Sequence, residues 1–185
     1  MNVTKYQLPT LICNQTESAS ILEIVIHTIL FQRTLGMIVI PKETESYLFD
    51  NLSYVAIDND RILNQVKHDL IHICQEKEGN TLPIIISLYH GVKKYGILGE
   101  YYEKLEFERW SITLEHVVDK TFADENTLEN KIVEIINIIL AVPELPIQLP
   151  NHEKFSFTIT SSSAPIQNSL VYDMFASATR MFGTP

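Results

Sequence analysis

The sequence predicts an α+β fold, and three observations support this prediction. Three segments carry apolar residues at the i, i+3/i+4, i+7 spacing of an amphipathic helix, whereas several others alternate or run apolar as strands do. The order of these segments does not repeat a strand–helix–strand unit, which disfavours a doubly wound parallel sheet. The 185 residues can bury the core of one domain, and no internal repeat divides them. We therefore expect a single domain over residues 1–185, with residues 151–185 forming a strand and a short helix.

The first predicted elements are an edge strand and a helix. Tyr6–Cys13 is predicted to be a short strand, and Pro9 places it toward a sheet edge because proline cannot donate to the ladder. Ser18–Arg33 has helical spacing and is expected to end at Gly36, which can adopt the left-handed conformation. Met37–Ile40 is rich in strand-forming residues and is predicted to be a second strand.

A further strand and a second helix follow. Glu43–Asn51 is expected to be a loop or hairpin tip, and Leu52–Ile57 a strand. Residues 58–60, Asp-Asn-Asp, supply capping side chains for a helix over Arg61–Glu78, because such side chains accept hydrogen bonds from the first amide groups.

Two long segments are predicted to form the centre of the sheet. Leu82–Tyr89 is strongly apolar and typical of a strand that is buried on both faces. His90–Glu100 contains three of the six glycines and two adjacent lysines, so it is expected to be a mobile loop. Tyr101–Val118 alternates, but its apolar face switches partway, which predicts a bulge near residues 107–110. A linker over residues 119–126 is expected to follow.

The segment from Thr127 to Pro150 is the most apolar helix candidate, and the rest of the chain is expected to be organised around it. Thr127 is a possible N-cap, Leu128–Val142 carries the helical spacing, and Pro143 ends it. Its apolar positions cover more than half of the circumference, whereas a surface helix needs a stripe of only roughly 100°. This helix is therefore either central in the fold or presents one flank to a partner.

The last predicted elements lie beyond residue 150. Phe155–Thr160 alternates as a strand does, and three serines at residues 161–163 suggest a loop. Leu170–Met181 has the spacing of an amphipathic C-terminal helix.

Composition and charge restrict the class of protein. The net charge of −9 and the pI near 5.1 disfavour a non-specific nucleic-acid binder and a broad contact with anionic lipid. Cys13 and Cys74 are too few and too far apart for a disulfide framework, which favours a reducing compartment. The first residues lack the pattern of a signal peptide, and no apolar run reaches the ~20 residues of a membrane span. We expect a cytoplasmic protein without stable membrane insertion.

Motifs for metal binding are sparse. The nearest pattern is His68 and His72, which share a helix face at i, i+4, with Cys74 two residues further on. A zincin needs Glu directly after the first histidine, and Asp69 stands there; no third ligand has a recognisable spacing. We therefore predict no metal and no cofactor, and a small metal-dependent hydrolase is only an alternative.

Two charged groups could in principle carry other chemistry. Glu106, Glu108 and Glu115 could pair as acid and base, but carboxylates on an alternating strand are more often a solvated face, so no catalytic residue is predicted. The lysines at positions 93 and 94 could contact a phosphate or a lipid head group, although a solubilising loop tip is the favoured interpretation.

A resemblance to a known family extends these predictions. The run Ile26–Gly36, IHTILFQRTLG, is similar to the HT-x-L-x-x-R-x-x-G helix motif of the autophagy-related protein 101 family of HORMA-domain proteins. The residues that match this motif are His27, Thr28, Leu30, Arg33 and Gly36. Further blocks agree in the same order: Tyr54-Val55 with the helix after it, Arg109–Ile112, Lys131–Ile136 with the proline-containing segment after it, and Phe155–Ile159. The resemblance covers roughly residues 5–160.

The resemblance implies a HORMA fold of the open type, with three helices on one side of a twisted, mainly antiparallel sheet and the third helix central. It also implies a non-enzymatic scaffold that pairs with the HORMA domain of autophagy-related protein 13. The pair would belong to the autophagy-initiation kinase complex at the phagophore assembly site. On this basis we expect these partner-interface residues: His27, Arg33, Val133, Asn137 and Leu140. From the residues alone, His27 is interpreted as a satisfied core or boundary histidine, and Val133, Asn137 and Leu140 as a flank that the core does not need.

One departure from the family concerns recruitment. Relatives outside this branch carry a Trp-Pro-Phe finger before the long hairpin strand, which recruits downstream factors. Residues 94–99 are KYGILG here, and Trp110 aligns with the strand, where a buried or half-buried aromatic is expected. Tyr95, Ile97 and Leu98 are the candidate recruitment loop that replaces the finger. A closed HORMA adaptor that wraps a peptide with its C-terminal segment is the alternative within the same fold.

Overall fold

A five-stranded sheet and a layer of helices make up most of the fold. The computed structural model describes residues 2–34, 40–50, 52–75, 79–97, 99–117, 122–143 and 154–161. The elements of these residues are β1 (Thr4–Gln7), β2 (Leu11–Cys13), η1 (Gln15–Glu17), α1 (Ser18–Thr34), β3 (Pro41–Glu45), β4 (Ser53–Ile57), α2 (Asp60–Gln75), β5 (Thr81–Gly96), β6 (Gly99–His116), α3 (Phe122–Ala141) and β7 (Lys154–Ser161). The three α-helices and the strands of the described residues confirm the predicted α+β class.

The large sheet is mainly antiparallel. Its strands lie in the order β1-β6-β5-β7; β5 pairs antiparallel with β6 and β7, whereas β1 and β2 pair in parallel with β6. The predicted N-terminal strand is split into β1 and β2 around Pro9. Both pieces lie at the edge of the sheet, where the missing N–H of a proline is tolerated.

A β-bulge in β6 sets which residues of this strand face the core. Leu88 pairs with Glu108 whereas the next residue, Tyr89, pairs with Glu106, so Phe107 is the extra residue. This position lies within the stretch where the switch of the apolar face predicts a bulge. The core residues that follow it on β6 are Trp110, Ile112 and Leu114.

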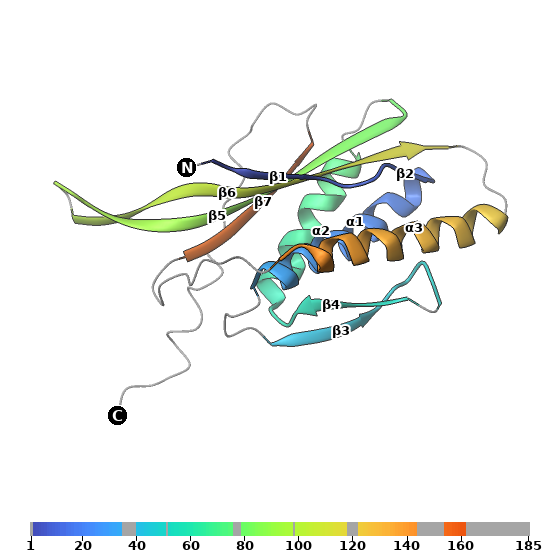
Figure 1. Cartoon of the computed structure of the whole chain (residues 1–185), viewed down its shortest axis with the longest axis horizontal. Helices are drawn as coiled ribbons and strands as arrows, with labels where there is room; N and C mark the ends of the chain where they lie inside the picture. Colours follow the sequence, from blue (N-terminus) through green and yellow to red (C-terminus); the bar gives the residue numbers. More distant parts are fainter. Residues whose placement is uncertain are drawn as a thin grey trace.

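The helices form a layer between the large sheet and a small second sheet. Figure 1 shows α1, α2 and α3 under one face of the large sheet, with the two-stranded β3–β4 sheet on the far side of the helices. α1 is the central helix, because thirteen of its seventeen residues are buried and it packs against α2, α3 and β4. The expectation that the third helix is central is therefore wrong. Within the described residues, no helix is long and apolar enough to cross a bilayer.

α2 is a surface helix whose start is fixed by a capping side chain. Asn59 Oδ1 accepts hydrogen bonds from the backbone N–H groups of Arg61 (3.0 Å) and Ile62 (3.3 Å), which confirms the predicted capping stretch. One face of the helix is buried, at helical spacing, through Ile62, Val66 and Leu70. Residues 76–78, which are predicted to continue this helix, lie outside the described residues.

The predicted loop at His90–Glu100 is wrong, because these residues form the end of a long hairpin. β5 continues to Gly96, β6 begins at Gly99, and these two glycines pair with each other. Gly99 has a φ of +115°, a conformation that glycine adopts without the strain of a side chain. The hairpin projects past the helical layer (Figure 1). Local composition suggests a loop here because it does not reveal that residues 90–96 pair across the hairpin with residues 99–105.

Two further boundaries differ from the prediction. β3 occupies residues 41–45, which are partly assigned to a loop by the sequence, and Ile40 lies outside it. A strand of a two-stranded sheet with a solvated face does not need an apolar run. A sequence analysis that identifies strands by apolar runs therefore does not find β3. α3 begins at Phe122, so Thr127 lies inside the helix and part of the predicted linker is helical. Gly36, residues 37–39 and the predicted helix over 170–181 lie outside the described residues.

Candidate interaction surface and the buried motif residues

α3 has two sides that differ in burial. The side against the core is apolar and buried through Leu128, Ile132, Ile135 and Ile139. Another side carries Val133, Asn137 and Leu140 at i, i+4 and i+7, so these residues form one line along the helix. Val133 is 39 % exposed, Leu140 is 50 % exposed, and Asn137 is exposed between them. These three residues are termed the α3 flank.

Ile138 is a further exposed apolar residue of α3, and it lies apart from the α3 flank. Its side chain is 37 % exposed, similar to that of Val133. Five positions separate the two residues, which places them roughly 140° apart around the helix axis. Ile138 therefore belongs to a different surface of the same helix.

Arg33 lies near the end of α1 and is enclosed in the core. Its Nε donates a hydrogen bond to Oε1 of Glu108 at 2.7 Å, and its Nη1 donates to the carbonyl oxygen of Pro143 at 3.0 Å. The guanidinium carbon lies 5.7 Å from the ring centre of Tyr6 and 5.4 Å from that of Trp110. The indole N–H of Trp110 donates to the same oxygen of Glu108. Arg33 therefore joins the end of α1 to β6 and to the end of α3.

The Arg33–Glu108 pair is a buried ion pair, with side-chain exposures of 1 % and 0 %. Removing one partner of such a pair is costly, about 3–5 kcal/mol, because the other charge stays buried without compensation. Arg33 Nη2 and Glu108 Oε2 have no hydrogen-bond partner among the described residues. The hydrogen bonds of Arg33 Nε to Glu108 and of Arg33 Nη1 to Pro143 therefore hold the end of α3 in place relative to α1 and β6.

His27 is buried in the middle of α1. Its ring stacks on Tyr54 of β4, with 6.0 Å between the ring centres, and its side chain is fully enclosed. Neither ring nitrogen has a hydrogen-bond partner in the described part of the chain. Burial, and secondarily the positive charge of Lys67, lowers the pKa of His27 from 6.5 to about 4. The expected burial of this histidine is confirmed, whereas no described residue supplies the hydrogen bond that is expected of a satisfied histidine.

The structure separates the five residues that are expected at a partner interface. Val133, Asn137 and Leu140 lie on the surface of α3, whereas His27 and Arg33 are buried within α1. A direct contact of His27 or Arg33 with a partner stays a prediction, and both side chains make core contacts in the isolated chain.

Glu108 is the residue of this region that the sequence-based interpretation misplaces. It is expected on a solvated face, but it is fully buried. Its spacing contains the relevant information, because Glu108 alternates in phase with Trp110, Ile112 and Leu114, which are all buried. A carboxylate in phase with core residues needs a buried cation, and the arginine of the helix motif is that cation.

The tip of the β5–β6 hairpin carries exposed apolar and aromatic side chains. Tyr95 is 75 % exposed and Ile97 is fully exposed. Lys93 pairs with Glu100 at 2.7 Å across the hairpin, and this hydrogen bond raises the pKa of Lys93. Leu98, the third residue of the predicted recruitment loop, lies outside the described residues. The hairpin thus ends in apolar side chains, with paired charges further along its strands.

Among the described residues, the side chains that could support catalysis or metal binding either form hydrogen bonds with other side chains or lie too far apart to form one site. Among the residues that the structure describes, no group of three or more His, Cys, Asp or Glu side chains could hold a metal ion. The rings of His68 and His72 lie 5.8 Å apart, as their helical spacing predicts. Glu106 accepts two hydrogen bonds of 2.8 Å from Arg109, and these lower the pKa of Glu106.

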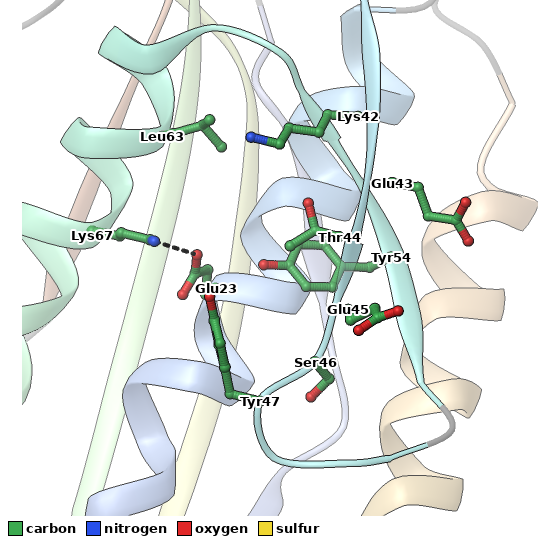
Figure 2. Close-up of a pocket in the computed structure, with 10 residues that line it drawn as sticks. All are labelled: Glu23, Lys42, Glu43, Thr44, Glu45, Ser46, Tyr47, Tyr54, Leu63 and Lys67. Carbon is green, nitrogen blue, oxygen red and sulfur yellow. Dashed lines mark ion pairs between the residues drawn. The ribbon is translucent and has the colours of Figure 1, made fainter.

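A pocket of 390 Å³ lies where β3 faces α1 and α2 (Figure 2). Glu23 of α1 and Lys67 of α2 line it, and Lys67 Nζ lies 3.9 Å from the Glu23 carboxylate. Burial, followed by the negative charge of Glu23, raises the pKa of Tyr54. Figure 2 shows Tyr47 extending from the β3–β4 turn toward Glu23. The sequence-based predictions place no site residue in this pocket.

The architecture is that of a HORMA-type α+β domain: a mainly antiparallel sheet with a long projecting hairpin, and helices packed on one face. The family model of autophagy-related protein 101 matches residues 10–146, which is well over half of the 185 residues. The chain therefore belongs to the autophagy-related protein 101 family, and its role is in autophagy. A comparison with curated proteins finds no match.

Proposed function

We propose that this protein is a non-enzymatic scaffold subunit of the autophagy-initiation kinase complex. It pairs with the HORMA domain of autophagy-related protein 13, stabilises that domain and helps to recruit downstream factors. It acts in the cytoplasm, at the phagophore assembly site. Membership of the autophagy-related protein 101 family supports the role in autophagy, and the partner and the assembly are the content of the proposal.

The observation that carries the proposal is the exposure of the α3 flank. Val133 and Leu140 are apolar, lie on one line of a regular helix, and leave roughly half of their surface in water. Burying the exposed half of each side chain in an interface is favourable by about 1 kcal/mol. A partner that presents a complementary apolar surface would therefore gain affinity from this flank without any rearrangement of the core.

The buried ion pair supports the same proposal. Arg33 donates to the carbonyl of Pro143, three residues beyond Leu140, and is itself held by Glu108. The end of α3 that carries Leu140 is therefore fixed before a partner arrives. A fixed interface loses less conformational entropy on binding than a mobile one.

The hairpin tip is the proposed recruitment surface. Tyr95 and Ile97 are exposed at the end of a hairpin that projects past the helices, away from α3 in the view of Figure 1. Two partners can therefore contact one chain at the same time, one at α3 and one at the tip. This arrangement is what a scaffold requires.

Light scattering of the purified chain, alone and mixed with the HORMA domain of autophagy-related protein 13, tests the proposal. We expect a 1:1 complex with wild type and separate monomers with Val133→Asp/Leu140→Asp. Both substitutions lie at exposed positions, so circular dichroism of the variant should match that of wild type. Failure of the folded wild-type chain to form any complex, or formation of an unchanged complex by the variant, would reject the proposed pairing.

A further inference from the structure

β3 is paired with β4 on one edge only, within the part of the chain that the structure describes. The amide of Asp58 donates to the carbonyl of Ile40 at 2.7 Å, and the amide of Ser46 donates to the carbonyl of Leu52 at 2.9 Å. In an antiparallel pair, residues that bond to the partner strand alternate with residues whose backbone groups point away. These two bonds therefore determine which residues of β3 bond to β4.

The outer edge of β3 presents the backbone of Glu43 and Glu45. Because positions 40 and 46 bond to β4, positions 42 and 44 also do, and the odd positions face outward. Pro41 is one of the outward positions, where the missing N–H of proline costs no ladder hydrogen bond. None of the described residues bonds to the outward N–H and C=O groups of Glu43 or Glu45.

This open edge forms one wall of the pocket at β3. Consecutive residues from Lys42 to Ser46 line the pocket, whereas a strand that presented its face would contribute only alternate residues. Leu63 and Lys67 of α2 form the opposite wall, and Glu23 contributes from α1 (Figure 2). This pocket is termed the β3–α2 groove. Its volume of 390 Å³ is within the usual range of ligand sites.

The charges along the groove differ between its inner and outer sides. Lys42 and Thr44 pair with the buried residues Ala56 and Tyr54, so their side chains share the inner face of the small sheet. Lys42 has no ion-pair partner among the residues described, and it extends into the groove in Figure 2. Lys67 lies on the far wall and is half-exposed. The inner side therefore carries the ammonium groups of Lys42 and Lys67 and the Glu23 carboxylate that pairs with Lys67, so Lys42 is its unpaired charge among the described residues, while Glu43 and Glu45 lie on the outer face.

We propose that the β3–α2 groove binds an extended segment of a partner protein as an additional strand on β3. The backbone of the segment bonds to the outward groups of Glu43 and Glu45, as in other cases of strand addition. Side chains of an added strand alternate between the two faces. An acidic side chain on the inner face contacts Lys42, which has no carboxylate partner among the described residues, and a neighbouring basic side chain lies beside the outer carboxylates. The groove is separate from the α3 flank and does not rest on the proposed function.

The test uses the full-length protein and a library of short peptides with Glu and Lys fixed at adjacent positions and the others randomised. The tightest selected peptide is labelled, and its affinity is measured by fluorescence anisotropy for wild type, Glu45→Pro and Glu45→Gln. Glu45→Pro removes an outward N–H and leaves the bonds between β3 and β4, so we expect about tenfold weaker binding. Glu45→Gln keeps the N–H and removes only an exposed charge, so the loss should be at most about threefold.

Two further measurements use the same peptide. Lys42→Glu should weaken binding at least as strongly as Glu45→Pro, because it places a carboxylate against the acidic side chain of the segment. Methylation of the peptide nitrogens that face β3 keeps every side chain and should abolish binding, which tests strand pairing even if Glu45→Pro does not fold. Val133→Asp/Leu140→Asp should leave peptide affinity unchanged, so the two proposals can fail independently.

Several results would overturn the proposal. They are the absence of any selected peptide, equal affinity for wild type and Glu45→Pro, and unchanged affinity of the methylated peptide. Slow hydrogen exchange of the Glu43 and Glu45 amides in the free protein would show that the chain itself covers the edge. A homodimer that is lost in Glu45→Pro would show that a second copy occupies the groove.

Discussion

The guanidinium of Arg33 has a carboxylate on one side, a helix-end carbonyl on another and aromatic rings nearby. A lysine at this position would keep the charge but would not reach both acceptors with a planar fork of donors. The attraction within a buried pair is largely offset by desolvation, so its main effect is on geometry rather than on net stability. This explains why the helix motif carries arginine at a position that is enclosed by the core.

The first prediction at this scale concerns the charge that is left behind. Glu108→Gln should lower the free energy of unfolding by about 3–5 kcal/mol, because Arg33 would remain charged and buried without its carboxylate. Urea unfolding measures this change. Glu106→Gln is the matched control on the same strand, since its pair with Arg109 is partly exposed and its loss should cost less than about 1 kcal/mol. Similar losses in the two variants would contradict a buried role for Glu108.

The second prediction concerns His27 and pH. Its pKa is about 4 in the folded protein and 6.5 in the unfolded chain, so the unfolded chain binds more protons between these values. The contribution of neutral His27 to the free energy of unfolding should be fully present above pH 6.5. It should fall by about 3 kcal/mol as the pH is lowered to 4 and should level off below that pH. His27→Leu should remove this part of the pH dependence. Parallel pH profiles of unfolding free energy for wild type and His27→Leu would show that His27 does not titrate in this way.

At the scale of the elements, apolar spacing identifies the helices and strands that bury an apolar face in the core. It does not identify strands that pair with each other in solvent. It predicts α1, α2, the apolar stretch of α3, the strands β4 and β7, and the bulge at Phe107. It misses β3 and the part of the β5–β6 hairpin within His90–Glu100, because those residues are held by cross-strand bonds rather than by burial. The same limit applies to the start of α3, where residues 122–126 carry no apolar run that marks a helix.

The candidate site was predictable in part. The α3 flank follows from the wheel of α3, because more apolar positions are present than one buried face can use. The burial of Arg33 does not follow from a wheel, because the apolar residues of α1 point in all directions and define no solvent side. The edge of β3 could not be found from sequence, because it depends on which residues bond to β4 and on the position of α2.

A prediction at this scale concerns the hairpin tip. Tyr95→Ser/Ile97→Ser should change the free energy of unfolding by less than about 0.5 kcal/mol, because both side chains are exposed. The variant should form the 1:1 complex normally but should reduce recruitment of downstream factors to sites of autophagosome formation. Fluorescence imaging in cells that lack the wild-type protein measures this recruitment. Recruitment equal to that of wild type would show that the hairpin tip does not recruit downstream factors.

At the scale of the whole molecule, the helical layer separates the surfaces that are proposed to bind other proteins. The large sheet covers one side of this layer and extends it with the hairpin, whereas the β3–β4 sheet covers the other side and forms the β3–α2 groove (Figure 1). The α3 flank lies on the helical layer itself. One buried core, organised around α1 and the Arg33–Glu108 pair, thus supports three separate contact surfaces.

The central claim is that the α3 flank binds the partner, and the most direct test compares two exposed residues of α3, Leu140 and Ile138. Isothermal titration with the HORMA domain of autophagy-related protein 13 would measure the dissociation constants of wild type, Leu140→Asp and Ile138→Asp. Leu140 belongs to the α3 flank, so Leu140→Asp should weaken binding by about tenfold or more, because a carboxylate would be buried without a partner. Ile138 is on a different surface of the same helix, so Ile138→Asp should weaken binding by at most about threefold. Equal effects of the two substitutions, or no effect of Leu140→Asp in a folded protein, would contradict the assignment of the α3 flank as the partner interface.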